Sequence, residues 1–165
     1  MKLFLIIISS LFFVLSCAAQ LPKEMPEDLI ISLHNGGGMT RSYKKIRIDG
    51  GVLEYSELTG NREMPGKWSA KIIGEDLARL YKVFVENRFD MIKNDERKGI
   101  VHDAGSENIS ISVRKTRSFH VTYGKNSPLS GNNLLRYQAV SRAIYEFVSR
   151  YQDRKTNDSS TDKGQ

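Results

Sequence analysis

The side chains that could carry out chemistry in this chain are three histidines, several carboxylates and a single cysteine, and their spacing limits what that chemistry can be. The histidines are His34, His102 and His120. A zinc site needs three or four ligands, commonly with two of them close together in the sequence. No His-x-x-x-His or Glu-x-x-His spacing occurs. His102 and Asp103 near Glu107 could hold a metal weakly, but we interpret them as surface residues and predict no metal or other cofactor.

The carboxylates and serines form no recognisable catalytic set. Hydrolysis by paired carboxylates needs two acids that converge in one cleft. Each candidate carboxylate has a simpler structural role. Asp49 is suited to a turn, Glu54 is expected on an exposed strand face, and Asp103 is expected in a loop. No serine lies in a Gly-x-Ser-x-Gly nucleophile elbow. These residues therefore predict a protein that is not an enzyme.

Three consecutive glycines lie in the stretch HNGGGMT, residues 34–40. Bare backbone amides at such a stretch could approach a phosphate group. A phosphate-binding loop, however, ends in Gly-Lys-Ser/Thr at the start of a helix, whereas this stretch lies between two predicted strands. We interpret it as a connection between strands.

Basic residues gather in two stretches that contain no acid, in a chain of net charge +6. If two predicted hairpins share a sheet face, these stretches form a cationic surface. That surface would suit an anionic lipid headgroup, an envelope polysaccharide or an acidic protein. The alternative is that they are solvated charges that discourage strand edges from pairing. The candidate binding residues are Arg41, Lys45 and Arg47 in the first stretch, beside Lys44, and Arg114, Lys115 and Arg117 in the second, followed by Lys125.

The N-terminus explains the single cysteine. Lys2 precedes an apolar run, residues 3–15, that is typical of a secretory signal and is too short to span a bilayer, which needs about 20 residues. Val14-Leu15-Ser16-Cys17 resembles a bacterial lipobox. The resemblance implies cleavage before Cys17, a diacylated thiol and anchoring in the cell envelope, in the outer membrane if the cell has two. The alternative is ordinary cleavage after Ala19, which would discard Cys17. Nucleic acid is not expected as a partner of an exported protein.

The chain divides into four segments. Residues 1–16 are the predicted signal peptide, and residues 17–27 are the lipidated cysteine and a tether that contains two prolines. Residues 28–152 form one domain, and residues 153–165 are polar and predicted to be disordered. With one cysteine in the whole chain, no internal disulfide can stabilise the domain.

Hydrophobic periodicity predicts the elements of that domain. Alternation indicates strands within residues 28–34, 43–55 and 66–72, with a hairpin turn at Asp49-Gly50. A helical spacing of apolar residues follows from Glu75 to about Asn87. A second hairpin is predicted over residues 107–123, and a last helix carries the stripe Tyr137, Val140, Ile144, Phe147, Val148 and Tyr151.

These elements predict an α+β fold, in which a single antiparallel sheet of about six strands, in the order ββββαββα, packs against two helices. Antiparallel pairing is favoured because short turns suffice to connect neighbouring strands. The residues expected to be buried together are Trp68, Leu80, Phe84, Ile111, Val121, Ile144 and Phe147.

Two family resemblances follow from this layout. The series IRIDGGVLEY, GKWSAKIIGEDLARLYKVFVENRFDMI, HDAGSENISISV and SFHVTYG looks like a domain of unknown function common in small bacterial lipoproteins, over about residues 28–148. That resemblance implies no known activity. NGGGMTRSYKKIRID, with Asp103 before ENISISVRKTRSFHVTY, resembles emfourin-type inhibitors of protealysin-like metalloproteases. The lipid anchor, the longer segment 52–72 and the polar tail depart from that family, so no inhibitory residue is carried over.

The sequence thus predicts a lipid-anchored, non-catalytic binding module whose partner is an envelope protein, a protease or an anionic polymer. The alternative is a membrane-tethered inhibitor of a thermolysin-like metalloprotease.

The lipid anchor can be tested by replacing Cys17 with alanine. The variant should remain unprocessed by the lipoprotein peptidase or be released in soluble form, because no thiol is left to carry the lipid. Cell fractionation and mass spectrometry of the N-terminus measure both outcomes. A Cys17→Ala chain that stays membrane-bound and cleaved like the wild type would contradict the anchor.

Overall fold

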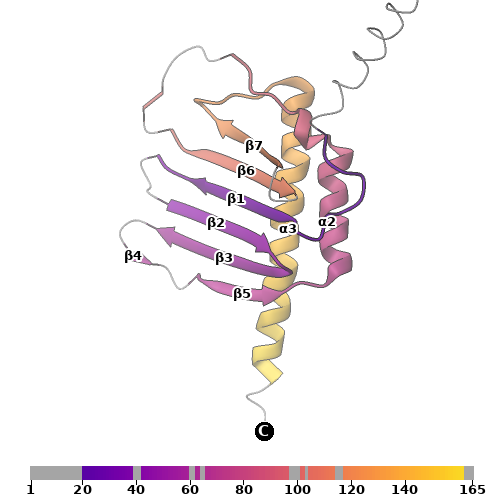
Figure 1. The fold of residues 1–165 in the computed structure, drawn as a ribbon. Helices are drawn as coiled ribbons and strands as arrows, with labels where there is room; N and C mark the ends of the chain where they lie inside the picture. Colours follow the sequence, from indigo (N-terminus) through magenta and orange to yellow (C-terminus); the bar gives the residue numbers. More distant parts are fainter. Residues whose placement is uncertain are drawn as a thin grey trace, which may run out of the picture.

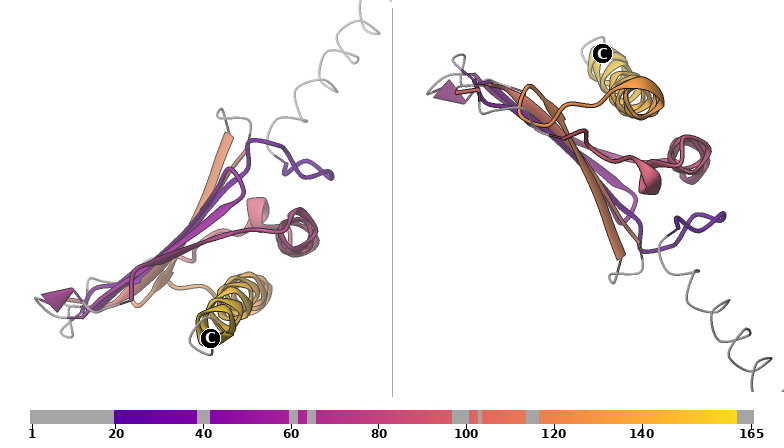
Figure 2. Two further views of the ribbon diagram at one scale, coloured as in Figure 1. Left: turned by 90° about the horizontal axis from the view of Figure 1, so that it is seen from below. Right: turned by 90° about the horizontal axis from the view of Figure 1, so that it is seen from above.

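The structure is a computed structural model, and it describes residues 20–38, 42–59, 62–63, 66–96, 101–102, 104–113 and 117–161. It contains one antiparallel sheet with two long helices on the same side of it (Figures 1 and 2). The elements are β1 (Ile30–Gly36), β2 (Ser42–Asp49), β3 (Val52–Thr59), β4 (Arg62–Glu63), β5 (Trp68–Lys71), α2 (Gly74–Glu86), the 3-10 helix η1 (Phe89–Met91), β6 (Ser106–Val113), β7 (Arg117–Gly124) and α3 (Gly131–Thr161).

The sheet has the order β4-β3-β2-β1-β6-β7, and β5 also pairs with β3. β4 and β5 share one edge, because β4 pairs with Leu58 and Thr59 while β5 pairs with the segment Val52–Tyr55. β1 lies in the middle and pairs with both β2 and β6. The predicted fold class, an α+β fold with one antiparallel sheet and two helices, is confirmed.

The β2–β3 hairpin has a turn one residue later than predicted. Asp49 still pairs with Val52, so it ends β2. The two turn residues are Gly50 and Gly51, with φ of 54° and 77°. A two-residue hairpin turn of this hand needs positive φ at both positions, which glycine adopts without a steric penalty.

The core lies between the sheet and the two helices. Alternate residues of the central strands, such as Ile31, Ile46 and Ile109, are fully buried there. The predicted stripes of both helices are buried as well. The predicted core residues are buried, with the exception of Trp68. Trp68 lies on the edge strand β5, where it packs against the core but is partly exposed.

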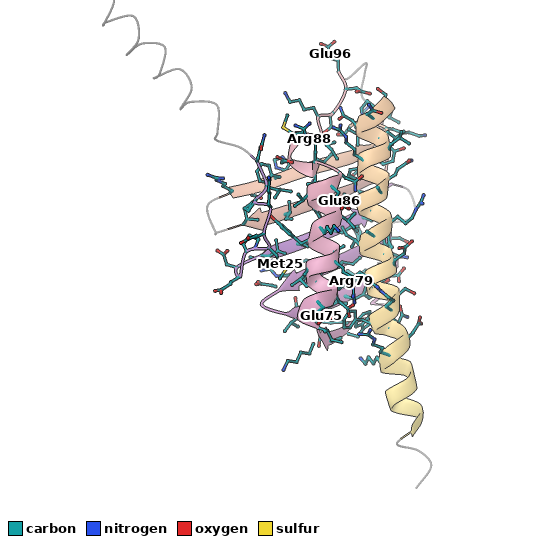
Figure 3. All side chains as sticks on the ribbon, turned by 90° about the vertical axis from the view of Figure 1, so that its right-hand side faces the viewer. Met25, Glu75, Arg79, Glu86, Arg88 and Glu96 are labelled. Carbon is teal, nitrogen blue, oxygen red and sulfur yellow. The ribbon has the colours of Figure 1, made fainter. Side chains whose placement is uncertain are left out.

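The predicted tether is docked on the domain over most of its length. Leu21 is buried, and its amide donates a hydrogen bond to Asp90 Oδ2 at 3.2 Å. The Tyr81 hydroxyl donates to the Pro22 carbonyl at 2.6 Å. Figure 3 shows this segment, with Met25 labelled, on the side of α2 away from α3. The predicted tether therefore packs on the domain from Leu21 onward, because Leu21 and Met25 cover apolar surface there.

Residues 153–161, in the segment predicted to be disordered, continue α3 in the structure. Arg154 explains part of this, because its guanidinium lies 5.0 Å from the Tyr151 ring centroid and donates to Asp76 Oδ2 at 3.2 Å. Residues 162–165 are outside the described part of the chain. Neither α2 nor α3, nor any other described helix, combines the length and apolar character needed to cross a membrane.

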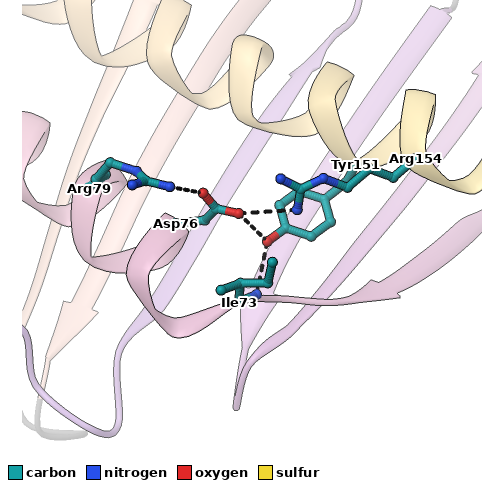
Figure 4. Close-up of polar contacts among 5 residues, drawn as sticks. All are labelled: Ile73, Asp76, Arg79, Tyr151 and Arg154. Carbon is teal, nitrogen blue, oxygen red and sulfur yellow. Dashed lines mark hydrogen bonds and ion pairs between the residues drawn. The ribbon is translucent and has the colours of Figure 1, made fainter.

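Asp76 is a buried carboxylate in the first turn of α2 that binds α3 (Figure 4). It accepts hydrogen bonds from Arg79, from the Tyr151 hydroxyl at 2.9 Å and from Arg154. The Tyr151 oxygen in turn accepts from the Ile73 amide at 2.9 Å. The hydrogen bonds from Arg79 and Tyr151 lower the pKa of Asp76 from 3.8 to about 2, because they favour the charged form against the effect of burial.

The packing of the helices can be tested at Phe84 and Phe147, both fully buried. Replacing either with alanine should destabilise the protein by about 3–5 kcal/mol, because the cavity that is left cannot collapse completely. Leu135→Ala is the matched control, since Leu135 is 65% exposed. Urea unfolding measures the free energy of unfolding of the three variants. Near-zero changes at both phenylalanines would contradict the placement of the two helices on the core.

A second prediction concerns acid stability. Because the folded-state pKa of Asp76 is lowered, its stabilising contribution is complete above about pH 4 and is lost as the pH falls through about 2. Asp76→Asn should therefore be less stable than wild type at pH 7, with the difference shrinking toward pH 2. Urea unfolding at pH 7, 4 and 2 measures this difference, and a constant difference would contradict the assigned role.

Candidate functional site

The basic residues predicted to bind a partner are only partly brought together. Lys45 and Arg47 alternate with the buried isoleucines of β2 and lie on the sheet face without helices. Arg117 starts β7 opposite Val113, so it is on the helix side of the other sheet edge. β1 and β6 separate β2 from β7, so the described residues Lys45 and Arg47 do not share a surface with Arg117. The remaining predicted residues, Arg41, Arg114 and Lys115, lie outside the described residues.

Lys45 and Arg47 instead line a cleft of about 570 Å³ at the β5 edge of the sheet, together with Lys67 and Lys155. We call this the cationic cleft. Glu54 is the one acidic residue among its described lining residues. Lys67 directly precedes β5, whereas Lys155 comes from the part of α3 that was predicted to be disordered. The sequence could not have joined these four cations, because three separate parts of the chain supply them.

The cations of this cleft are mostly unneutralised. Arg47 pairs with Asp49 at 2.5 Å. Within the described part of the chain, Lys45, Lys67 and Lys155 form no ion pair. Two aromatic rings of the cleft lining, Tyr55 and Trp68, stack with centroids 5.5 Å apart. The cleft therefore offers positive charge beside a rigid aromatic pair.

A second site, which the sequence analysis did not predict, is a row of polar residues across five strands on the helix-facing side of the sheet. The strand register aligns these residues, and we call them the polar row. In each strand the same-phase neighbour on the side of the core is apolar or aromatic, such as Leu33 in β1 and Ile109 in β6. The polar row is Glu57, Lys44, Asn35, Glu107 and Tyr123.

Glu107 accepts more side-chain hydrogen bonds than any other residue described here for the polar row. Its Oε1 accepts from the Tyr137 hydroxyl at 3.1 Å and the Ser141 hydroxyl at 2.6 Å. Its Oε2 accepts from the Tyr145 hydroxyl at 2.8 Å and from Asn35 Nδ2 at 3.2 Å. The three hydroxyls come from one stripe of α3 with a spacing of four residues, which places them on the same helix face. Glu107 thus binds the first half of α3 to the sheet.

A cleft of about 540 Å³ opens over Glu107 between the sheet and α3, and we call it the tyrosine cleft. Burial raises the pKa of Tyr137 and of Tyr145 above the ordinary value of 10, so both phenols stay protonated at neutral pH. Gly124 lies at the cleft, where a Cβ atom would be only 2.8 Å from the Gly105 carbonyl oxygen. The described lining includes Glu107, Tyr123, Tyr137, Gln138, Arg142 and Tyr145.

The sequence did carry a signal for this second site. Asn35 is in phase with Ile31 and Leu33, and Glu107 is in phase with Ile109 and Ile111. A polar residue in the core-facing phase of a strand needs a hydrogen-bonding partner. Glu107 was named above only beside the possible metal ligands His102 and Asp103, so its polar side chain in a core-facing position was missed.

The candidate metal ligands are not brought together in the described structure. His102 is exposed, and Asp103 lies outside the described residues. Among the side chains that are described, no group of three His, Cys, Asp or Glu residues could hold a metal ion. His34 and His120 are exposed on the sheet face away from the helices.

The chain matches no protein-family model, and a search of curated proteins finds no match.

Proposed function

We propose that this protein is a lipid-anchored lipoprotein of the cell envelope whose domain is a non-catalytic binding module for an anionic envelope polymer. The observation that carries the choice of partner is the cationic cleft, where Lys45, Lys67 and Lys155 outnumber the single described acid, Glu54, and form no ion pair with a described residue. Unpaired cations in a concave surface concentrate positive potential and attract polyanions.

The docking of the N-terminal segment supports a domain held close to the membrane. Leu21 follows Cys17 by four residues, and four extended residues span at most about 14 Å. A lipid on Cys17 would therefore keep the domain near the headgroups rather than at the end of a long tether. Partners on the membrane surface or in the adjacent polymer layer are within reach.

The internal carboxylates support a non-catalytic role. Asp76 is occupied by Arg79, Tyr151 and Arg154. Glu107 has four hydrogen-bond donors for its two oxygens. A general acid or base must be free to exchange a proton with a substrate, and these two groups are engaged within the fold.

The second candidate is a tethered inhibitor of a thermolysin-like metalloprotease, which must present one rigid loop to the protease. Gly37 and Gly38 have φ of 94° and 75°, so the β1–β2 connection starts with a backbone path that favours glycine. Residues 114–116, at the other candidate loop, lie outside the description. Gly36, which ends β1, pairs with Ser106 at the start of β6, so Gly36 and Val113 at the end of β6 lie at opposite ends of the sheet.

The proposal can be tested with the full-length protein in detergent and a soluble polyuronate. Binding should weaken steeply as ionic strength rises from about 0.05 to 0.3 M, because exposed charges are then screened. The double variant Lys45→Gln/Lys67→Gln should bind several-fold more weakly, as measured by calorimetry. The matched control is Lys82→Gln/Lys93→Gln, which removes two exposed lysines from outside the cleft.

Three results would argue against the anionic-polymer proposal. They are equal binding of a neutral polysaccharide, equal losses in both double variants, or binding confined to anionic vesicles. Stoichiometric loss of thermolysin activity on adding the protein would favour the inhibitor instead.

A further inference from the structure

The sheet face away from the helices, which we call the open face, is continuous with the cationic cleft. Figure 2 shows α2 and α3 on one side of the sheet and no described element over the other. Residues that pair in neighbouring strands lie on the same face. The strand register therefore aligns one line of open-face side chains across the sheet, the open-face row: Ser56, Lys45, His34, Asn108 and Thr122. Ser56 and Lys45 also line the cationic cleft, so the row begins there.

The open-face row offers hydrogen-bonding groups beyond the cleft. Neighbouring strands are about 4.8 Å apart, so the row extends about 14 Å from Lys45 to Thr122. Asn108 Nδ2 donates to Thr122 Oγ1 at 2.7 Å. This bond uses neither the amide oxygen of Asn108 nor the hydroxyl hydrogen of Thr122, so the pair can still accept and donate. These are the bonds that a sugar hydroxyl makes.

The described open face of β1, β6 and β7 carries no carboxylate. Its residues are serines, histidines, glycines, an asparagine, a threonine and an isoleucine. A negatively charged chain that leaves the cationic cleft along the open-face row thus meets no like charge among the described residues. Charge complementarity at the cleft is followed by neutral polar groups along the row.

An exposed aromatic ring borders the open-face row. Tyr43 lies two residues before Lys45 in β2, so both side chains are on the open face. Tyr43 is 40% exposed, and its ring centroid lies 6.3 Å from that of His34. The ring packs over Gly36, where a Cβ atom would collide with it. The C–H face of a sugar ring can pack against such an aromatic ring, whereas a phosphate chain has no apolar face to offer.

We propose that the polymer is a linear acidic polysaccharide that lies across the strands on the open face. Lys45 and Lys67 bind its carboxylates in the cationic cleft, Tyr43 packs against a sugar ring, and Asn108 and Thr122 bind hydroxyl groups further along the row. This inference rests on the proposed function, because the path starts in the cationic cleft. It adds the chemical class of the polymer and the direction in which it runs.

The test compares a disaccharide and an octasaccharide prepared from one polyuronate. Each is titrated by calorimetry into the full-length protein in detergent at about 0.15 M salt, where charges are screened over about 8 Å. The disaccharide can occupy the cationic cleft, whereas the octasaccharide also reaches Asn108 and Thr122. The octasaccharide should bind more than about tenfold more tightly, because its further contacts form within one complex.

Asn108→Asp places a carboxylate on the open-face row without changing the size of the side chain. It should weaken octasaccharide binding several-fold by like-charge repulsion. The disaccharide should be almost unaffected, since Asn108 lies two strands, about 10 Å, from Lys45. The matched control, Asn132→Asp, makes the same change at an exposed position at the start of α3 and should alter neither affinity.

The sugar contact is tested separately at Tyr43. Tyr43→Ala should weaken octasaccharide binding several-fold and leave the binding of inorganic polyphosphate unchanged, because only the sugar packs against the ring. Leu135→Ala removes another exposed apolar side chain and should change neither. Equal losses for polyphosphate and octasaccharide in Tyr43→Ala would overturn the assignment of a polysaccharide.

The outcomes separate this inference from the proposed function. The path across the sheet is wrong, while the function of the cationic cleft stands, if Lys45→Gln/Lys67→Gln weakens binding but both oligosaccharides bind equally, or if Asn108→Asp has no more effect than Asn132→Asp. An absence of salt-dependent binding of either oligosaccharide would overturn both proposals. Thermal unfolding checks that each variant folds, and Thr122→Asp on the edge strand β7 tests the same path if Asn108→Asp does not.

Discussion

The position of α3 over the sheet is the constraint on which both clefts depend, and two internal carboxylates set it. Glu107 on β6 collects the hydroxyls of the first half of α3. Asp76 on α2 collects Tyr151 and Arg154 from the second half. On the same helix, Val140, Ile144, Phe147 and Val148 pack into the hydrophobic core. Apolar burial supplies most of the driving force, while directional bonds fix where along the sheet the helix lies.

The distribution of charge follows from the cost of desolvation. Although the chain carries a net charge of +6, the charged residue that is buried in the described structure is the carboxylate Asp76, which a phenol and two guanidinium groups satisfy. The unpaired lysines of the cationic cleft are exposed, since an ammonium group is expensive to bury without a partner. The result is a domain with two chemically different clefts, one lined by cations and the other by a carboxylate that four neutral groups donate to.

The N-terminal segment links the fold to the membrane. Leu21 and Met25 cover one side of α2, and hydrogen bonds at Leu21 and Pro22 fix the path of the chain. A lipid on Cys17 would then set not only the location of the domain but also which side of it faces the membrane, because few residues separate the anchor from the docked leucine.

The sequence by itself determined the elements and their buried faces. Alternation identified Ile31, Leu33, Ile46, Ile48, Ile109 and Ile111, and helical spacing identified both helix stripes, because these patterns depend only on local geometry. Only the tertiary structure decided which strands are neighbours, and so aligned Asn35 with Glu107 and separated Arg117 from Arg47. It also docked Leu21 and kept Lys155 in a helix. Those outcomes depend on contacts between residues far apart in the chain, which no local pattern encodes.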